Sequence, residues 1–212
     1  MSKFRIPQNL SEITLEQYQK YCDAVETIEN EMFLQDTIIS ILCDITIQDL
    51  RGLTLKEIQV IALSVSNVVS KFSDEEMQFY NRFTLNGVEY GFIPNLNEIS
   101  YGENKDIVTY MAEGVKSYHK AMAVLYRPIL KTSNDTYSIS EYKVPNAHES
   151  ALKEMPVSVV LGAIVFFWSL TKELLQHIPS SFLKQEEMGE LQQMMKKEYT
   201  NTTGEHTMKS TH

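Results

Sequence analysis

The sequence predicts a mainly α-helical fold with a minor β part: a helical domain around a central apolar helix at about residues 156–178, with one β-hairpin at about residues 80–92. Three observations lead to this prediction. Three segments in the first seventy residues combine helix-start signals with helical apolar spacing. An Asn-Gly pair separates two alternating segments, and seventeen consecutive residues carry no charge. The length suits one domain over residues 1–200 and a flexible tail over residues 201–212.

The first and third predicted helices begin at capping boxes, in which two side chains satisfy backbone N–H groups reciprocally. Thr14 with Gln17 opens the first helix, and Thr54 with Glu57 opens the third. The second helix is expected from Glu31 to about Cys43. Its apolar side is predicted to consist of Phe33, Ile38, Ile41 and Leu42. The third helix has apolar positions at Ile58, Ile61, Ala62, Val65, Val68 and Val69.

The hairpin has the clearest strand signal in the chain. Asn86 and Gly87 suit a two-residue type I′ turn, because both residue types tolerate positive φ. This turn sets a register in which Leu85 pairs with Val88 and Phe83 pairs with Tyr90. One face of the hairpin is then apolar and the other polar, as expected of a half-buried antiparallel pair.

The second half of the chain is expected to contain one long helix from Lys105 to about Leu130. We expect it to break near Gly114 and to stop or kink near Pro128, because a proline ring cannot continue a helix. Three shorter elements are also predicted: a strand at Tyr137–Tyr142, a helix at Ala147–Met155 and a polar helix at about Ser181–Tyr199.

The uncharged stretch Met155–Thr171 raises the question of a membrane span. A spanning helix needs about 20 apolar residues, whereas this stretch begins at Pro156 and contains Ser158 and Gly162. Charges of both signs flank it, so it has no positive-inside bias. Beyond Lys172 the apolar positions become one-sided. We therefore expect a core helix of a non-membrane protein, with Ser158 and Gly162 allowing another helix to approach closely.

Composition and charge exclude several classes of function. The net charge of −9 and the pI near 5.1 argue against nucleic-acid binding, which needs clustered Lys and Arg. Cys22 and Cys43 stand outside any zinc-ligand spacing and are expected to be buried thiols. The first ten residues lack the apolar segment of a signal peptide, which predicts a location in the cytoplasm of the cell that makes the protein. Carboxylates at Glu26, Glu29 and Glu31 are interpreted as a solvated helix face.

No motif predicts catalysis, a cofactor or a metal. The five histidines lie outside ligand motifs, no serine lies in a nucleophile elbow, and the eight glycines form no phosphate-binding loop. We therefore expect a protein that is not an enzyme. An enzymatic alternative would require His119, Glu103 and Arg127 to converge in a pocket.

Two regions are candidates for binding a protein partner. Tyr126 and Arg127 follow an apolar segment and could present a hydroxyl and a planar cation to a partner; alternatively, they clamp the end of a helix against the hairpin or a carboxylate. Met188, Met194 and Met195 could form an adaptable surface, because thioethers are flexible and polarisable. Methionine also fills cores, so both interpretations remain open for these residues.

Three stretches resemble an uncharacterised family of virion-morphogenesis proteins of tailed bacteriophages, of the crAss-like and marine kind. They are RFTLNGVEYGFIPNLNEISYGE, HKAMAVLYRPIL and MPVSVVLGAIVFFWSLTKELL, and the resemblance covers about Arg82 to Leu175. Asn104 departs from the family pattern, which often has an aromatic residue there. The resemblance implies no catalytic residues. It implies either a tail-assembly chaperone or a small structural component of the virion near the tail or the head–tail connector.

The acidic charge and the methionine-bearing C-terminal segment favour the chaperone, with other phage structural proteins, tail proteins foremost, as partners. The hairpin, which could pair with a neighbour through its edge, favours the structural component and a homo-oligomer. Such a component could be incorporated in the virion. A membrane-active phage protein is the third alternative, but it would need a longer uninterrupted apolar stretch than residues 156–175 provide.

Overall fold

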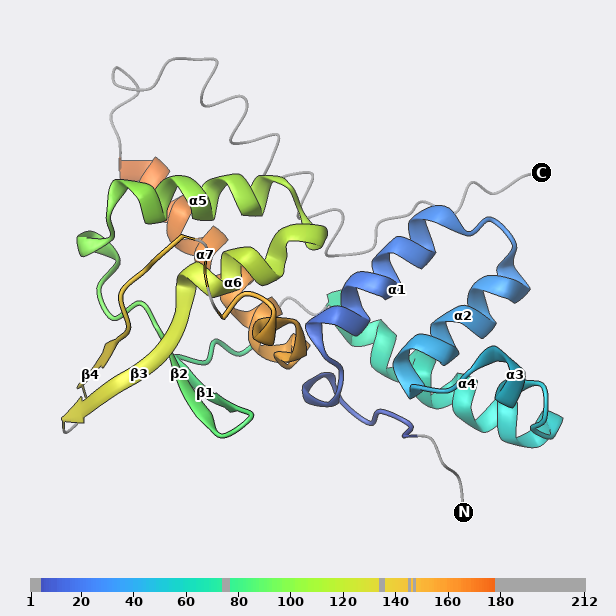
Figure 1. The fold of residues 1–212 in the computed structure, drawn as a ribbon. Helices are drawn as coiled ribbons and strands as arrows, with labels where there is room; N and C mark the ends of the chain where they lie inside the picture. The colour runs from blue at the N-terminus through green and yellow to red at the C-terminus, as the bar shows by residue number, and fades with distance from the viewer. Residues whose placement is uncertain (1–4, 74–76, 134–135, 145, 147, 178–212) are drawn as a thin grey trace.

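Helices and a small antiparallel sheet make up the computed structural model, which describes residues 5–73, 77–133, 136–144, 146 and 148–177. The α-helices are α1 (Leu15–Thr27), α2 (Glu31–Cys43), α3 (Ile47–Leu50), α4 (Leu55–Val69), α5 (Tyr101–Ala112), α6 (Tyr118–Leu125) and α7 (Val157–His177). The strands β1 (Arg82–Leu85), β2 (Val88–Phe92), β3 (Tyr126–Ser133) and β4 (Thr136–Ile139) form one sheet in that order. Helices α1–α4 form one end of the molecule, and the sheet with α5 and α6 forms the other (Figure 1). The prediction of a mainly helical fold with a minor β part is confirmed.

Both predicted capping boxes are present at the N-termini of α1 and α4. At α1, Gln17 Oε1 accepts the Thr14 backbone N–H at 3.0 Å, and Thr14 Oγ1 accepts the Gln17 N–H at 3.1 Å. Thr54 and Glu57 make the same reciprocal pair at α4. Each box satisfies backbone donors that have no partner within the helix, so these sequence signals set the helix starts directly.

The predicted apolar side of α2 is partly wrong. Ile39, Leu42 and Cys43 are the buried residues, whereas the Phe33 side chain is 50% exposed. Each helical residue advances about 100°, so Phe33 lies about 120° around the helix from Ile39. The side of α2 that faces α1 and α4 is therefore the one that contains Ile39. The short helix α3, capped by Thr46, was not predicted.

The hairpin β1–β2 has the predicted turn and register. Phe83 pairs with Tyr90 and Leu85 with Val88, while Asn86 and Gly87 adopt φ angles of 50° and 77°. Tyr90 and the rest of β2 that follows it are buried, whereas Val88 beside the turn is exposed. The apolar face is therefore buried only at the end that continues into the sheet.

The helical stretch expected from Lys105 to about Leu130, with a break near Gly114, is wrong in its last part. Gly114 adopts a φ of 75° and separates α5 from α6, as expected of a glycine break. Helix α6 ends at Leu125, and the next residues form β3, in which Tyr126–Pro128 pairs with Phe92–Tyr90 of β2. Pro128 has no backbone N–H, so a helix through this segment could not complete its hydrogen bonds. The neighbouring strand β2 supplies hydrogen bonds to the segment instead. Tertiary pairing thus decides the conformation of Tyr126–Leu130.

Two shorter predictions hold in part. Strand β4 covers Thr136–Ile139 and pairs with β3, so only the first half of the strand expected at Tyr137–Tyr142 is formed. A 3-10 helix at Ala151–Glu154 forms the last part of the short helix expected at Ala147–Met155. The polar helix expected at Ser181–Tyr199, the tail and Met188, Met194 and Met195 lie outside the described residues.

Helix α7 begins one residue after Pro156, as the sequence indicates. Six of its first eight side chains are buried with the core, namely Val157, Val159, Val160, Leu161, Ala163 and Ile164. From Val165 to Leu170 the residues are half-buried or exposed. The structure therefore does not confirm a helix around which the whole fold packs. Among the described residues, no helix combines the length and apolar character needed to cross a membrane.

Gly162 permits a close approach to α7, but the neighbour is not the helix that the sequence led us to expect. A Cβ atom added to Gly162 would lie 2.1 Å from the carbonyl oxygen of Gln78 and 3.4 Å from the Cα of Phe79. The approaching segment is the extended chain just before β1. Glycine is thus required where the backbone of residues 78–79 crosses α7.

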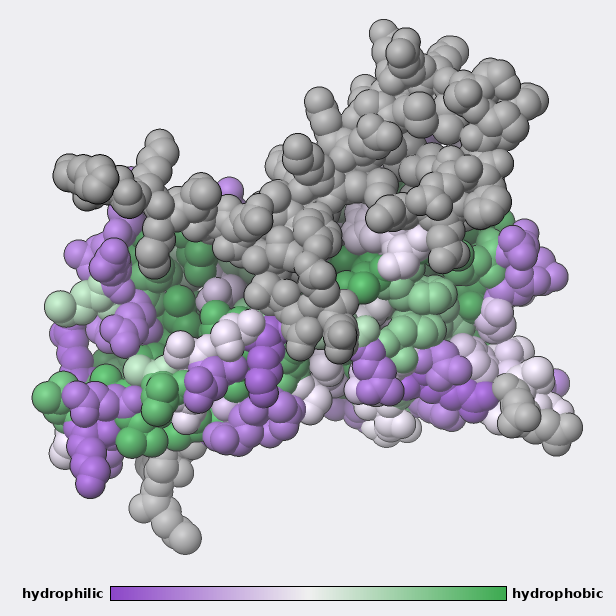
Figure 2. Space-filling model, turned by 180° about the vertical axis from the view of Figure 1, so that it is seen from behind, coloured by the Kyte–Doolittle hydropathy of each residue, from purple (hydrophilic) through white to green (hydrophobic). Residues whose placement is uncertain are grey.

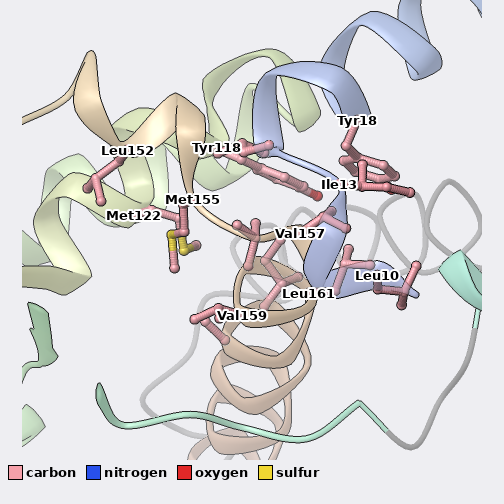
Figure 3. Close-up of a cluster of buried hydrophobic side chains, with 14 of the residues drawn as sticks. Leu10, Ile13, Tyr18, Tyr118, Met122, Leu152, Met155, Val157, Val159 and Leu161 are labelled. Carbon is pink, nitrogen blue, oxygen red and sulfur yellow. The ribbon is translucent and has the colours of Figure 1, made fainter. Parts of the chain in front are cut away.

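The two ends of the molecule join where the N-terminal chain pairs with the chain that enters α7. Thr14 and Pro156 form an isolated antiparallel bridge. The Leu15 N–H donates to the Met155 carbonyl and the Val157 N–H donates to the Ile13 carbonyl, each at 2.8 Å. Figure 3 shows the side chains around this bridge converging from the N-terminal segment, α6, the 3-10 helix and α7. The labelled residues are Leu10, Ile13, Tyr18, Tyr118, Met122, Leu152, Met155, Val157, Val159 and Leu161.

Gly162→Ala should lower the free energy of unfolding by about 1–3 kcal/mol, because the added methyl group would displace the Gln78 backbone. Urea unfolding followed by circular dichroism measures this change. Gly102→Ala is the matched control, since the nearest atom to its added Cβ is 3.9 Å away. That variant should be neutral or more stable by up to about 1 kcal/mol. Similar effects of the two substitutions would contradict the close approach at Gly162.

Candidate functional site

A groove of about 430 Å³ opens beside the sheet and is the candidate binding site of the described residues. Its walls come from the chain before β1, the end of β2 with the loop after it, the start of β4, and α7. The lining residues, which define the aromatic groove, are Phe79, Asn81, Phe92, Ile93, Pro94, Asn95, Leu96, Thr136, Tyr137 and Phe166. Segments that are far apart in the sequence therefore meet at one site.

Packed aromatic rings form the wall that anchors the groove to the core. The rings of Phe79 and Phe166 stack with centroids 4.2 Å apart. Phe92 meets both edge-on, at 5.0 Å from Phe79 and 5.7 Å from Phe166. Phe92 also packs edge-on against the fully buried Tyr126 at 5.2 Å. Because these contacts reach the core, the groove wall is preformed rather than dependent on a ligand.

Tyr137 fixes the opposite rim by reaching from β4 across the sheet. Its ring covers Gly91, where an added Cβ would lie 2.3 Å from the ring. Its hydroxyl donates to the Phe92 carbonyl at 2.7 Å and approaches the Asn81 carbonyl at 3.1 Å. The Arg82 guanidinium lies 4.4 Å from the ring centroid, a favourable cation–π distance. Burial raises the pKa of Tyr137, with Arg82 opposing it, so the hydroxyl stays protonated and donates.

The chemistry of the groove suits binding of an apolar group. Phenyl rings, Pro94, Ile93 and Leu96 supply apolar surface, and Asn81, Asn95 and Thr136 supply polar groups at the exposed rim. Among the described residues, the lining contains no carboxylate, imidazole, thiol or ammonium group. Such a surface can take up an apolar side chain and align a neighbouring peptide group, and its titratable group among the described residues is the Tyr137 hydroxyl, which already donates to the Phe92 carbonyl.

The structure buries the two residues that the sequence singled out for partner binding beside the hairpin. Tyr126 is fully buried, and its hydroxyl donates to the Tyr80 carbonyl at 2.6 Å. Arg127 Nη2 lies 2.8 Å from Glu103 Oε1, with both side chains about nine-tenths buried. These positions agree with the alternative interpretation, in which both residues clamp the end of α6 against the hairpin and a carboxylate.

Glu103 links β3 to the start of α5 through this ion pair. Its other oxygen accepts the Ser100 backbone N–H at 2.8 Å, which completes the α5 capping box. Burial alone raises the pKa of Glu103, but the Ser100 hydrogen bonds and Arg127 together hold it below its ordinary value. Burial lowers the pKa of Arg127, and Glu103 opposes that change. The Arg127 Nε atom is buried without a hydrogen-bond partner among the described residues.

His119 does not join this pair. Its Nδ1 lies 3.1 Å from Gln19 Nε2 and its Nε2 lies 3.5 Å from a Glu149 oxygen, so it links α1 to α6 and the turn at Glu149. Burial, with Lys153, lowers the pKa of His119. The enzymatic alternative requires His119, Glu103 and Arg127 to converge in a pocket. Among the described residues, none of the three lines the aromatic groove.

Other reactive groups are sequestered or scattered. Cys43 is buried, which raises the pKa of its thiol to about 11, and Cys22 is half-buried. Within the described ranges, no three His, Cys, Asp or Glu side chains are grouped so that they could hold a metal ion. Comparisons of the chain with protein-family models, curated proteins and solved structures find no match. Function is therefore inferred from the residues of the chain itself.

Sequence reasoning missed the aromatic groove. Phe79, Phe92 and Phe166 belong to segments as much as 87 residues apart, and no spacing rule connects them. The two nearest signals were Gly162 and Gly91, whose small size marks places where another group comes close. The sequence could identify Gly162 as a point of close approach, but it could not name Gln78 as the neighbour.

Glu103→Gln should lower the free energy of unfolding at pH 7 by about 3–5 kcal/mol, because it leaves a buried Arg127 without its counter-charge. The pKa of Glu103 is below its ordinary value in the folded protein, so the ion pair contributes fully above that ordinary value. Its contribution is lost as pH falls through the lower folded pKa. Urea unfolding at steps from pH 7 to pH 3 should therefore show that the difference in free energy of unfolding between wild type and variant becomes smaller at acid pH. A difference that stays constant over this pH range would contradict the role of the charge.

Proposed function

We propose that this protein is a non-enzymatic phage assembly factor, of the tail-assembly-chaperone kind, which binds an apolar segment of another phage protein. The aromatic groove is the observation that supports the proposal. Its rings are held by the core, its rim carries amide and hydroxyl groups, and the titratable group in its described lining, the Tyr137 hydroxyl, is engaged by the Phe92 carbonyl. A chaperone needs this combination, because it must hold an apolar segment without changing it chemically.

The groove suits one or two large side chains rather than a whole helix. A volume of about 430 Å³ is in the lower part of the range of pockets that hold drug-sized ligands. Phe79 and Phe166 are partly exposed, so an aromatic or branched side chain could stack on them. The Asn81 and Asn95 side chains at the rim could hydrogen-bond to the backbone on either side of that residue.

Leu96→Arg should weaken partner binding at least tenfold, because it places a charge inside an apolar groove where the partner would bury it. The test is co-expression with each tail protein of the same phage genome, followed by size-exclusion chromatography of the complex. Leu130→Arg is the matched control, because Leu130 is exposed on β3 and does not line the groove. A partner that co-elutes equally with both variants would show that the groove is not the binding site.

The sheet supports a second candidate function, a small structural component of the virion. Strands β1 and β4 are the edges of the four-stranded sheet that the described residues form, so each could pair with a strand of a neighbouring chain. Repeated pairing of this kind would build a ring or a filament.

Light scattering on the untagged protein distinguishes the two candidates. We expect a monomer or dimer, because the chaperone must keep its groove open for a partner. A discrete ring or larger oligomer would contradict the chaperone and favour the structural component.

A further inference from the structure

The negative charge of the chain is concentrated in its first helices. Between residues 12 and 49 there are nine Asp and Glu residues and a single Lys, so this stretch accounts for eight of the nine net negative charges. The acidic residues are Glu12, Glu16, Asp23, Glu26, Glu29, Glu31, Asp36, Asp44 and Asp49. The surface of α1 and α2 is therefore strongly acidic, whereas the rest of the chain is close to neutral.

Four of these carboxylates and two exposed apolar side chains lie on the last turns of α1, the connecting residues and the first turn of α2. Only three residues separate the two helices, so the last turn of α1 and the first turn of α2 lie side by side at the end of the molecule (Figure 1). Met32 is 76% exposed and Phe33 is 50% exposed. The carboxylates are Asp23, Glu26, Glu29 and Glu31, and together these six residues define the acidic tip.

The carboxylates of the acidic tip lack partners within the described part of the chain. None of the four lies in an ion pair there, whereas Glu12 and Glu16 of the same region pair with Arg5 and Lys20. Like charges repel one another, and at physiological salt the repulsion extends over about a Debye length of 8 Å. A cation that approached the tip would relieve this repulsion. Met32 and Phe33 expose apolar surface in the same region, and burial of that surface against a partner is favourable.

We propose that the acidic tip is a docking surface for a cationic amphipathic helix of another protein. Met32 and Phe33 contact the apolar face of that helix, and the surrounding carboxylates pair with its Lys and Arg side chains. Recognition of an apolar helix face by this pair is physically favourable, because the flexible Met32 side chain adapts to its partner and the Phe33 ring supplies a large apolar area. This site is separate from the aromatic groove and does not depend on it.

Charge excludes the other main occupants. Nucleic acid and anionic lipid both carry negative charge and would be repelled by the four carboxylates. A second copy of the chain, bound through the same surface about a two-fold axis, would bring two acidic tips together. The surface does contain other exposed apolar residues at this end, among them Leu55, Val60 and Leu63 of α4. Figure 2 shows hydrophobic patches among hydrophilic residues there, but α4 does not share the concentration of acid.

The test uses a labelled 18-residue helical peptide with Leu on one face and Lys on the other, and measures its binding to the full chain by fluorescence anisotropy. The expected affinity falls about tenfold between 50 and 300 mM salt, because the attraction is electrostatic and screened. A peptide with Glu in place of Lys and a peptide with Ser in place of Leu should both bind at least tenfold more weakly. No binding of the Leu–Lys peptide at low salt would overturn the proposal.

Matched variants place the binding on the acidic tip. Met32→Ser should weaken binding at least fivefold, while Leu55→Ser, at an apolar residue of almost the same exposure of 75%, should leave it unchanged. Glu26→Gln with Glu29→Gln should weaken binding and flatten its salt dependence, while Glu98→Gln with Glu141→Gln should not. Equal effects of a variant and its control would show non-specific attraction to an acidic protein.

Two further readouts separate this proposal from the proposed function. Leu96→Arg in the aromatic groove should leave binding of the Leu–Lys peptide unchanged, and a loss of binding in that variant would assign the peptide to the groove. Sedimentation of the protein alone at low salt should show no self-association through the tip. Self-association that disappears in Met32→Ser would show that a second copy occupies the tip, and would overturn the cationic partner.

Discussion

The short pairing of residues 13–15 with residues 155–157 is the constraint on which the rest of the structure depends. Its two backbone hydrogen bonds join chain segments about 140 residues apart and lie within the core. Buried backbone groups need partners, so the segments cannot separate cheaply. The register is also fixed, because a shift of one residue would exchange buried Ile13 and Leu15 for Thr14. Pro156, which has no N–H to donate, occupies the middle of the bridge.

The aromatic groove follows from that constraint. Helix α7 starts immediately after the bridge, so its direction, and with it the position of Phe166, is set by the pairing with the N-terminal chain. Gly162 then lets the backbone of Gln78 and Phe79 cross α7 closely enough for the two phenyl rings to stack. Tyr137 closes the opposite side by reaching over Gly91. Gly162 and Gly91 thus leave the room that the side chains of Phe79, Phe166 and Tyr137 occupy.

The two proposed surfaces differ in chemistry and in stiffness. The aromatic groove is uncharged and anchored by rings that continue into the core, so it would select a partner by shape. The acidic tip lies at the turn between α1 and α2, where a partner would be selected by charge and would contact the exposed Met32 and Phe33. The buried pair of Glu103 and Arg127 fixes α5 to β3 and takes no part in either surface. An assembly factor with both surfaces could bind one apolar and one basic segment of its partners.

The sequence by itself determined the features that depend on neighbouring residues. Capping boxes at Thr14 and Thr54 set helix starts, and Asn86-Gly87 set the turn and register of the hairpin, because the groups that satisfy each other lie within four residues. Tertiary structure decided whatever needed a distant partner. Tyr126–Leu130 became part of a strand because β2 and β4 were available to pair with it, and the aromatic groove exists because remote segments meet. Local energies fix local geometry, whereas burial and strand pairing are settled only when the whole chain has packed.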